Sequence, residues 1–317
     1  MNSVLLSTAM SAIKTWLVLS IISGLSSLAL AENWPLMEQQ EVVGEVRWYR
    51  VSEADTLVSV ARRFGIGYDA MLRANPTFDI WLPESERYLR LPTQYILPAA
   101  AKKGLVLNLA EMRLYYFPEV HPRRVHSFPV GIGREGWETP VTSTRVIKKV
   151  VSPAWYPPQS IRDEALANGH PLPDVVPAGP ENPLGSHALR LGLSSYLLHG
   201  TNRPAGVGMR VSHGCIRLYP EDIVALFDLV SVGVELHIVD QPYKVGWREN
   251  ELFLEVHPAA YHREEWDQTQ SVLPTSLQAL MSLVTKDTEV FLDWDQIYEA
   301  LAEADGVPVS IGIKQSW

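Results

Sequence analysis

Two short stretches decide the fold: residues 211–218 read VSHGCIRL, and residues 198–202 read LHGTN. They contain Cys215, the only cysteine of the 317 residues, and two histidines. His199 lies 16 positions before the cysteine, and His213 lies two positions before it. A free thiol is mostly protonated at neutral pH, but a neighbouring imidazole can take its proton and create a nucleophile. The two stretches therefore indicate a nucleophilic cysteine assisted by histidine.

Gly214 suggests what the nucleophile attacks. A thiolate that adds to a carbonyl creates an oxyanion, which needs fixed N–H donors. Glycine allows the backbone to turn, so that N–H groups beside Cys215 can point to one spot. The residues therefore favour thiol-mediated acyl transfer or hydrolysis.

A metal site is the alternative for the same residues. Imidazole and thiolate ligands for zinc could come from His187, His199, His213 and Cys215. No CxxC or HExxH motif accompanies them, and ligands at positions 213 and 215 are awkwardly spaced for one ion. The residues therefore disfavour a metal site.

Composition and the N-terminus favour an exported globular protein. The chain is 46% hydrophobic, and its 27 basic and 36 acidic side chains give no basic surface for nucleic acid. Residues 1–31 resemble an export signal, with an apolar run from Trp16 to Leu30 and expected cleavage after Ala31. An uncleaved anchor and a start at Met10 are alternatives. A lone thiol outside the cytoplasm risks oxidation, which favours a chemical use for it.

Residues 46–94 are expected to form a small βααβ domain after a polar, acidic linker at 32–45. Asp55, Thr56 and Leu57 can begin the first helix, and residues 68–74 predict the second. The unit resembles a LysM domain at Tyr49, Val51, Asp55-Thr56-Leu57, 61–65 (ARRFG), Leu72, Asn75-Pro76 and 89–92 (LRLP), although Ala54 replaces the usual glycine. This resemblance implies binding of N-acetylglucosamine polymers such as peptidoglycan.

Residues 104–240 predict a mainly β domain. Strand patterns occur at 105–109, 113–117, 127–131, 144–150, 189–191, 196–198 and 234–239, with a helix at 220–227. The proline-rich segment 153–183 interrupts them and includes a short helical piece near 160–167. Such a long irregular segment is typical of a lid or binding loop.

Residues 241–317 form an acidic C-terminal extension with 13 acidic and 5 basic side chains. A strand at 252–256 and a helix over 293–303, begun by Asp293, are expected within it, and we expect it to pack on or shield the preceding domain. Five histidines away from the motif are expected in exposed loops: His121, His126, His170, His257 and His262.

The motif region resembles the L,D-transpeptidase family with a YkuD-type catalytic domain. The matching segments are 131–133 (GIG), 138–140 (ETP), 182–185 (NPLG), 188–191 (ALRL), 199–202 (HGTN) and 212–218 (SHGCIRL). The resemblance covers residues 104–240 and implies a β-sandwich with cysteine and histidine facing a cleft. The full length, including residues 241–246 (QPYKVG), resembles the Gram-negative periplasmic branch.

The resemblance implies a role for each motif residue. Cys215 would be the nucleophile and His199 the general base, its ring oriented by the backbone carbonyl of Gly200. His213 and the backbone N–H groups of Gly214 and Cys215 would bind the oxyanion. Arg217 would hold a substrate carboxylate, with a structural salt bridge as the alternative. The substrate loops would be shaped by Ser212, Thr201 and Asn202.

The implied reaction joins a peptidoglycan stem peptide to an acceptor through a thioester, with loss of the terminal D-Ala, and it needs no cofactor or metal. A second stem as acceptor gives a 3–3 crosslink, a lysine of an outer-membrane lipoprotein gives anchoring, and water gives carboxypeptidase or endopeptidase activity. A non-catalytic peptidoglycan-binding protein is the remaining alternative.

Overall fold

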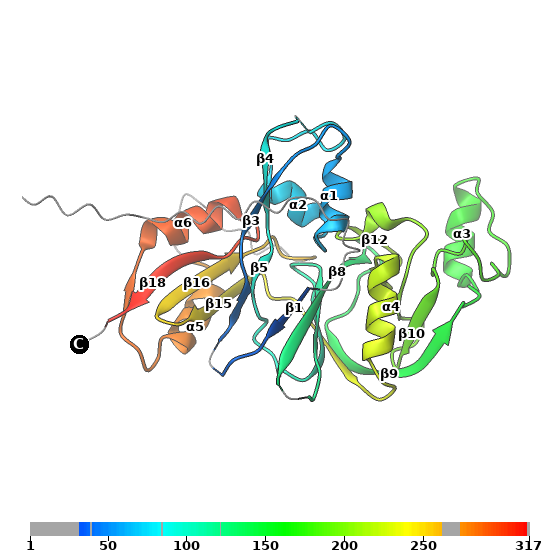
Figure 1. Ribbon diagram of the computed structural model, residues 1–317. Coiled ribbons are helices and arrows are strands. Elements are labelled where there is room, and N and C mark those ends of the chain that lie inside the picture. The colour runs from blue at the N-terminus through cyan, green and yellow to red at the C-terminus, as the bar shows by residue number, and fades with distance from the viewer. Residues whose placement is uncertain (1–31, 39, 84, 121, 262–272, 316–317) are drawn as a thin grey trace, which may run out of the picture.

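The computed structural model describes residues 32–315 except positions 39, 84, 121 and 262–272. In this part of the chain no helix is long and apolar enough to cross a membrane. The expected export signal lies outside the described residues. Figure 1 shows a small βααβ unit above a large sheet, with the C-terminal strands and helices on the opposite side from α3.

The large sheet is ten-stranded in the described part of the chain. Its strands are β1 (Glu32–Pro35), β6 (Gly104–Asn108), β7 (Arg113–Phe117), β8 (Arg124–Gly133), β9 (Thr142–Val151), β10 (His187–Leu191), β11 (Leu197–His199), β12 (Arg210–Ser212), β13 (Ile216–Leu218) and β14 (Glu235–Val239). The order runs β8-β13-β11-β10-β9-β14-β6-β7, and β7 pairs back with β8, so the sheet closes on itself. The expected mainly β fold with helices is confirmed.

The core of this domain lies inside the closed sheet. Its inward side chains include Leu105, Phe128 and Leu198, all fully buried. Helix α4 (Pro220–Leu229) adds Ile223 and Leu226 from one side. The two motif strands, β11 and β13, are neighbours in this sheet. The packed core behind them fixes their positions.

The linker expected at 32–45 is wrong. Strand β1 pairs antiparallel with β8, with Glu32 opposite Ser127, and β2 (Val42–Gly44) pairs with β5 (Gln94–Ile96). Val42 and Ile96 are fully buried against Phe253 of the C-terminal part. In β1 only alternate residues are partly buried, so the segment looks polar in sequence, and the strand partners of β1 and β2 lie at least 50 residues away.

The βααβ unit has the expected order: β3 (Arg47–Arg50), α1 (Leu57–Arg63), α2 (Tyr68–Ala74) and β4 (Tyr88–Leu91). Thr56 caps α1 by accepting the Ser59 N–H at 3.0 Å, and the Ser59 hydroxyl accepts the Thr56 N–H in return. Arg62 reaches across to Glu221 at the start of α4 through two hydrogen bonds of 2.8 and 2.7 Å. The unit is therefore fastened to the large domain.

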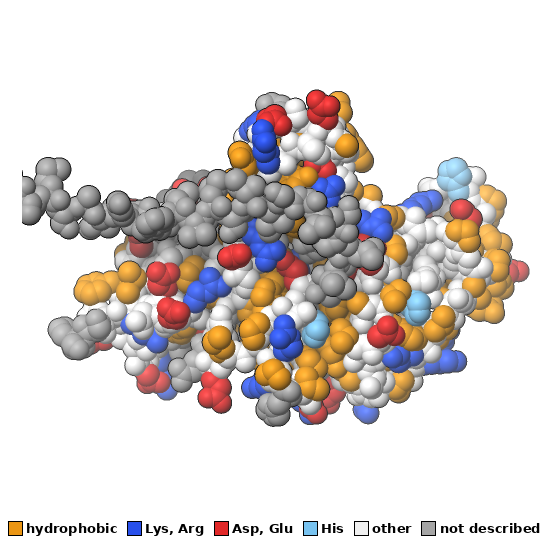
Figure 2. Space-filling view, viewed as in Figure 1, with side chains coloured by type: hydrophobic (Ala, Val, Ile, Leu, Met, Phe, Trp, Pro, Cys, Tyr) orange, Lys and Arg blue, Asp and Glu red, His pale blue; other side chains and the backbone are white. Residues whose placement is uncertain are grey.

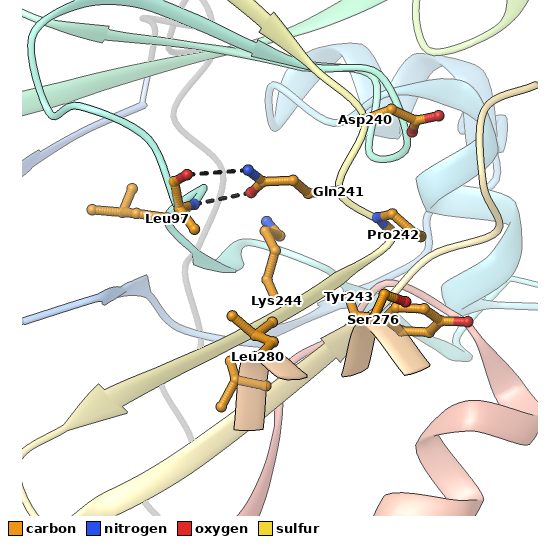
Figure 3. A pocket seen from close by; sticks show the side chains of 10 residues that line it. Leu97, Asp240, Gln241, Pro242, Tyr243, Lys244, Ser276 and Leu280 are labelled. Atoms are coloured by element: carbon orange, nitrogen blue, oxygen red, sulfur yellow. Dashed lines mark hydrogen bonds between the residues drawn. The ribbon is translucent and has the colours of Figure 1, made fainter. Parts of the chain in front are cut away.

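The C-terminal extension has a second sheet in the order β15 (Tyr243–Arg248), β16 (Glu251–Val256), β18 (Val309–Lys314) and β17 (Val290–Leu292). Helices α5 (Thr275–Val284) and α6 (Trp294–Glu303) pack against its core. Asp293 caps α6 by accepting the Gln296 N–H, as expected. A cavity of about 230 Å³, lined by Gln241, Lys244 and Leu280 among others, lies where this extension meets the large domain (Figure 3).

A buried ion cluster joins the extension to the large domain. Lys244 Nζ lies 2.8 Å from carboxylate oxygens of both Glu111 and Glu255, and it donates to the Ile96 carbonyl at 2.6 Å. His257 Nε2 lies 2.6 Å from Glu255. The extension therefore packs on the large domain, as expected.

The expectation of exposed loops is wrong for two of the five histidines. His257 is buried in the ion cluster, and His126 is half-buried within β8. Their environments come from tertiary packing and not from neighbours in sequence. His170 is exposed, and His121 and His262 lie outside the described residues.

Candidate active site

Adjacent strands bring His199 and Cys215 together. His199 is the last residue of β11, and Cys215 directly precedes β13. The two strands pair in parallel, with His199 opposite Arg217 and Leu198 opposite Ile216. A histidine and a cysteine separated by 16 residues thus emerge from neighbouring strands.

His199 is buried and held in one orientation. Its Nδ1 lies 2.5 Å from the carbonyl oxygen of Gly200, which can only accept, so Nδ1 carries the proton and Nε2 keeps its lone pair. Burial and the nearby Arg217 guanidinium lower the pKa of His199 to about 4. At neutral pH the ring is therefore an uncharged base.

Cys215 is protonated in the resting site. Burial raises the pKa of its thiol, although the Leu197 backbone N–H and the Arg217 charge act in the opposite direction. The thiol donates to the Ser195 carbonyl at 3.4 Å. A thiol in this state needs a base before it can attack a carbonyl.

The turn before Cys215 is fixed by its own hydrogen bonds. Gly214 has φ +97°, and a Cβ there would lie 2.8 Å from the Tyr196 ring, so only glycine fits. The Ser212 hydroxyl donates to the Cys215 carbonyl at 2.6 Å and accepts the Gly214 N–H at 3.2 Å. The oxyanion role expected of the Gly214 N–H would therefore require this second bond to break.

His213 points to α3 (Gln159–Ala167). Its Nε2 lies 2.8 Å from Glu164 Oε2 of that helix and 3.1 Å from Arg134 Nη2. The Trp137 ring meets the imidazole edge-on, with centroids 4.8 Å apart. Arg134 and Glu164 are not identifiable as site residues from the sequence; the only available clue to Arg134 is that it follows the matching Gly131-Ile132-Gly133 segment.

Arg217 is half-buried beside the thiol. Within the described part of the chain it forms no ion pair, so the structural salt bridge weighed as an alternative is not formed there. Its Nε is buried and has no hydrogen-bond partner. Burial and the nearby Arg203 charge lower the pKa of Arg217, which is the setting in which an anion would be stabilised.

Thr201 and Asn202 hold the neighbouring loops. Thr201 is buried, and its hydroxyl accepts the Arg203 N–H at 2.9 Å. Asn202 is exposed and donates to the Glu181 carbonyl at 3.0 Å, which ties it to the end of the proline-rich segment. Both side chains are occupied by backbone partners.

The zinc alternative lacks a ligand set. Among the described residues, Glu111, Glu255 and His257 are the only three acidic, histidine or cysteine side chains whose ligand atoms come close enough for one ion. Lys244 already pairs with both of those carboxylates. No three of the motif residues converge in this way, and His187 pairs with Ser186 at 2.9 Å.

Comparison with known proteins identifies the family of the chain. Residues 102–239 match the family model of the L,D-transpeptidase catalytic domain, and residues 49–81 match the LysM domain. The chain is 38% identical to the probable L,D-transpeptidase YbiS of Escherichia coli K12, covering 92% of this chain and 95% of that protein. It is 40% identical to the probable L,D-transpeptidase ErfK/SrfK of Salmonella typhimurium, covering 90% of this chain and 93% of that protein.

The chain belongs to the L,D-transpeptidase family. The similarity extends through the LysM domain and the C-terminal extension, because it covers nine-tenths of the length. A more distant relative, the putative L,D-transpeptidase YkuD of Bacillus subtilis, is 27% identical over 60% of this chain. The protein is an L,D-transpeptidase enzyme.

In this L,D-transpeptidase the LysM domain contacts the loop that leads into the cysteine motif. The first backbone N–H groups of α2, from Tyr68 and Asp69, donate to the carbonyls of Val207 and Gly208 at 3.0 and 3.1 Å. Gly208 has φ +81°, and a Cβ there would lie 2.2 Å from the Tyr68 nitrogen. The two backbones therefore touch at Gly208 and Gly67, and neither position has room for a side chain.

Proposed function

We propose that this L,D-transpeptidase uses Cys215 as the nucleophile in a two-step acyl transfer on peptidoglycan stem peptides. The observation that carries the proposal is a neutral His199 at the end of β11 and a protonated thiol directly before β13, the strand paired with β11. The Gly200 carbonyl fixes the tautomer in which Nε2 can accept a proton. Base and nucleophile are thus present in the protonation states that the first step needs.

The first step forms a thioester. His199 Nε2 takes the thiol proton, and the thiolate attacks the carbonyl of the third stem residue. The bond to the terminal D-Ala breaks, and the imidazolium returns its proton to the departing amine. Arg217 would hold a carboxylate of the substrate, while the oxyanion would be stabilised by the backbone N–H groups of Gly214 and Cys215. His213 is expected from the sequence to share this role, but its Nε2 faces Glu164 of α3.

The second step releases the enzyme. An acceptor amine attacks the thioester carbonyl, gives its proton to His199, and leaves an amide while the Cys215 thiol is regenerated. A second stem peptide as acceptor would give 3–3 crosslinks, and a lipoprotein lysine would give anchoring. Water would give a tripeptide. The LysM domain would hold the glycan strand of the same polymer.

The reaction would take place in the periplasm. The N-terminal segment has the pattern of an export signal, and expected cleavage after Ala31 would make Glu32, the first residue of β1, the start of the mature chain. Peptidoglycan is the substrate that both domains would share in that compartment.

The test is to incubate the mature protein and its Cys215→Ala variant with disaccharide-tetrapeptide and to identify products by mass spectrometry. Crosslinked dimers from the wild-type protein alone are the expected result. Tripeptide alone would show that water wins without the right amine, and lipoprotein peptides would then be tested as acceptors. The absence of any Cys215-dependent product would favour a binding protein.

A carbapenem provides a second readout of the nucleophile. We expect incubation to raise the intact mass of the wild-type protein by one acyl adduct on Cys215, and to leave the Cys215→Ala variant unchanged. His199→Ala should slow the acylation, because the thiol then lacks its base. An unshifted wild-type mass would contradict the assignment of Cys215.

A further inference from the structure

Helix α3 reaches the cysteine motif through Glu164 and buries none of its own side chains. Leu166 exposes 65% of its surface, as does Tyr156 just before the helix. Hydrophobic side chains gather at the end of the molecule that carries α3 (Figure 2). Apolar packing therefore does not hold this helix in place.

The base of the same segment is firmly fixed. Asn182 is fully buried, donates to the carbonyls of Pro153, Val176 and Pro177 at 2.9, 3.2 and 3.0 Å, and accepts the Leu184 N–H at 2.8 Å. The two ends of the segment are thus tied together, and α3 extends from them. This arrangement allows the helix to move while its attachment stays in place.

Glu164 makes the contact between α3 and the motif. Its Oε1 pairs with Arg134 Nη2, and its Oε2 accepts from His213 Nε2 at 2.8 Å. The carboxylate can only accept, so this contact requires a proton on His213 Nε2. The Arg134 guanidinium, 3.1 Å from the same nitrogen, can only donate, so it lies beside that N–H without bonding to it. The Arg134 and His213 contacts hold the pKa of Glu164 below its usual value, so it is ionised at neutral pH.

The two groups that face Glu164 belong to the catalytic domain. Arg134 continues from β8, and its backbone N–H donates to the Ser212 carbonyl at 3.0 Å, within the motif. His213 is two residues from the nucleophile, and Trp137 braces its ring. A guanidinium and an imidazole N–H held side by side are a recognition site for a carboxylate.

We propose that Arg134 and His213 form a carboxylate subsite for the stem peptide, and that Glu164 occupies it until substrate arrives. The inference rests on the proposed function, because the stem tetrapeptide supplies the carboxylate. Substrate would displace Glu164, and α3 would move away from the motif. The apparent Kd would then equal the intrinsic Kd divided by the fraction of molecules in which Glu164 leaves the site free.

The test measures binding of disaccharide-tetrapeptide by calorimetry in the Cys215→Ala background, where no product forms. Adding Glu164→Ala should lower Kd by about twofold to fivefold, the range that a partly exposed ion pair supports. Adding Arg134→Met to that double variant should raise Kd by about tenfold, because a charged hydrogen-bond donor is lost. The same measurement with a ligand whose C-terminus is amidated identifies the carboxylate. If Arg134→Met no longer raises Kd for the amidated ligand, the subsite binds the D-Ala carboxylate. If it still raises Kd, the subsite binds another carboxylate of the stem.

Asp163→Ala is the matched control, since it removes the same charge from the neighbouring position of α3. Asp163 contacts Gln159 at 2.7 Å and touches neither Arg134 nor His213. It should leave Kd unchanged. An equal or higher Kd in the Glu164→Ala variant, with an unchanged circular dichroism spectrum, would overturn the proposal and make Glu164 a structural support. Failure of the proposed function would appear separately, as a wild-type enzyme that makes no Cys215-dependent product.

Discussion

Replacing Gly208 by alanine should loosen the LysM domain from the catalytic domain. The new Cβ would lie 2.2 Å from the Tyr68 nitrogen and 2.3 Å from the Gly67 Cα. Both neighbours are backbone atoms, so no side-chain rotation can relieve the clash. The two backbones must separate, and the hydrogen bonds from Tyr68 and Asp69 to this loop would break with them.

The expected loss of stability can be divided into two parts. Alanine in the left-handed region at φ +81° costs about 1–2 kcal/mol. Each of the two backbone hydrogen bonds adds about 0.5–1.5 kcal/mol when lost. The total is about 2–5 kcal/mol. Gly169 has φ +77° with no atom within 4 Å of a Cβ placed there, so Gly169→Ala should lose only about 1–2 kcal/mol, the cost of the left-handed backbone.

Urea unfolding followed by circular dichroism compares the two variants, and limited proteolysis shows whether the LysM domain is released. Gly208→Ala should be the less stable variant and should be cut between its domains. Activity should fall as well, because the same loop packs against Arg217 of the active site: a Cβ at Gly206 would lie 2.9 Å from Arg217 Nη1. A shift of the loop would therefore displace Arg217. Equal stability and equal proteolysis in the two alanine variants would refute the reasoning.

Two further predictions concern buried ionisable groups. Burial and the nearby Glu221 charge raise the pKa of Asp222 to about 8. Between about pH 4 and pH 8 the folded protein therefore keeps the Asp222 proton, whereas the unfolded chain loses it. The free energy of unfolding should fall as the pH rises through this range. Asp222→Asn should lessen the loss between pH 5 and pH 8 by about 2–4 kcal/mol in urea titrations; an unchanged pH slope would contradict this. Lys244→Met should cost about 3–5 kcal/mol by leaving Glu111 and Glu255 without a counter-charge, and Glu255→Gln should recover part of it. A cost within the error of the titration would show that the ion cluster does not hold the extension.

The sequence by itself determined the features that depend on neighbouring residues. Helix starts are local, so the start of α1 at Asp55, Thr56 and Leu57 and the cap of α6 at Asp293 can be predicted from the few residues around each, and the structure selects Thr56 as the cap of α1. The short helix near 160–167 is α3 (Gln159–Ala167), because it too has a local pattern. The cysteine motif indicated a thiol and a base, and its match to the L,D-transpeptidase family fixed the reaction class.

Only the tertiary structure decided which distant residues meet. Strand β1 looks like a linker because four residues carry too little periodicity to identify a partner near residue 127. The contact between Glu164 and His213 spans 49 positions, and the Lys244–Glu111 pair spans 133. Such pairs leave no trace in local composition, since they form only when the closed sheet brings their elements together. The same packing buries His199 and so makes it a neutral base, which its position in the sequence could not show.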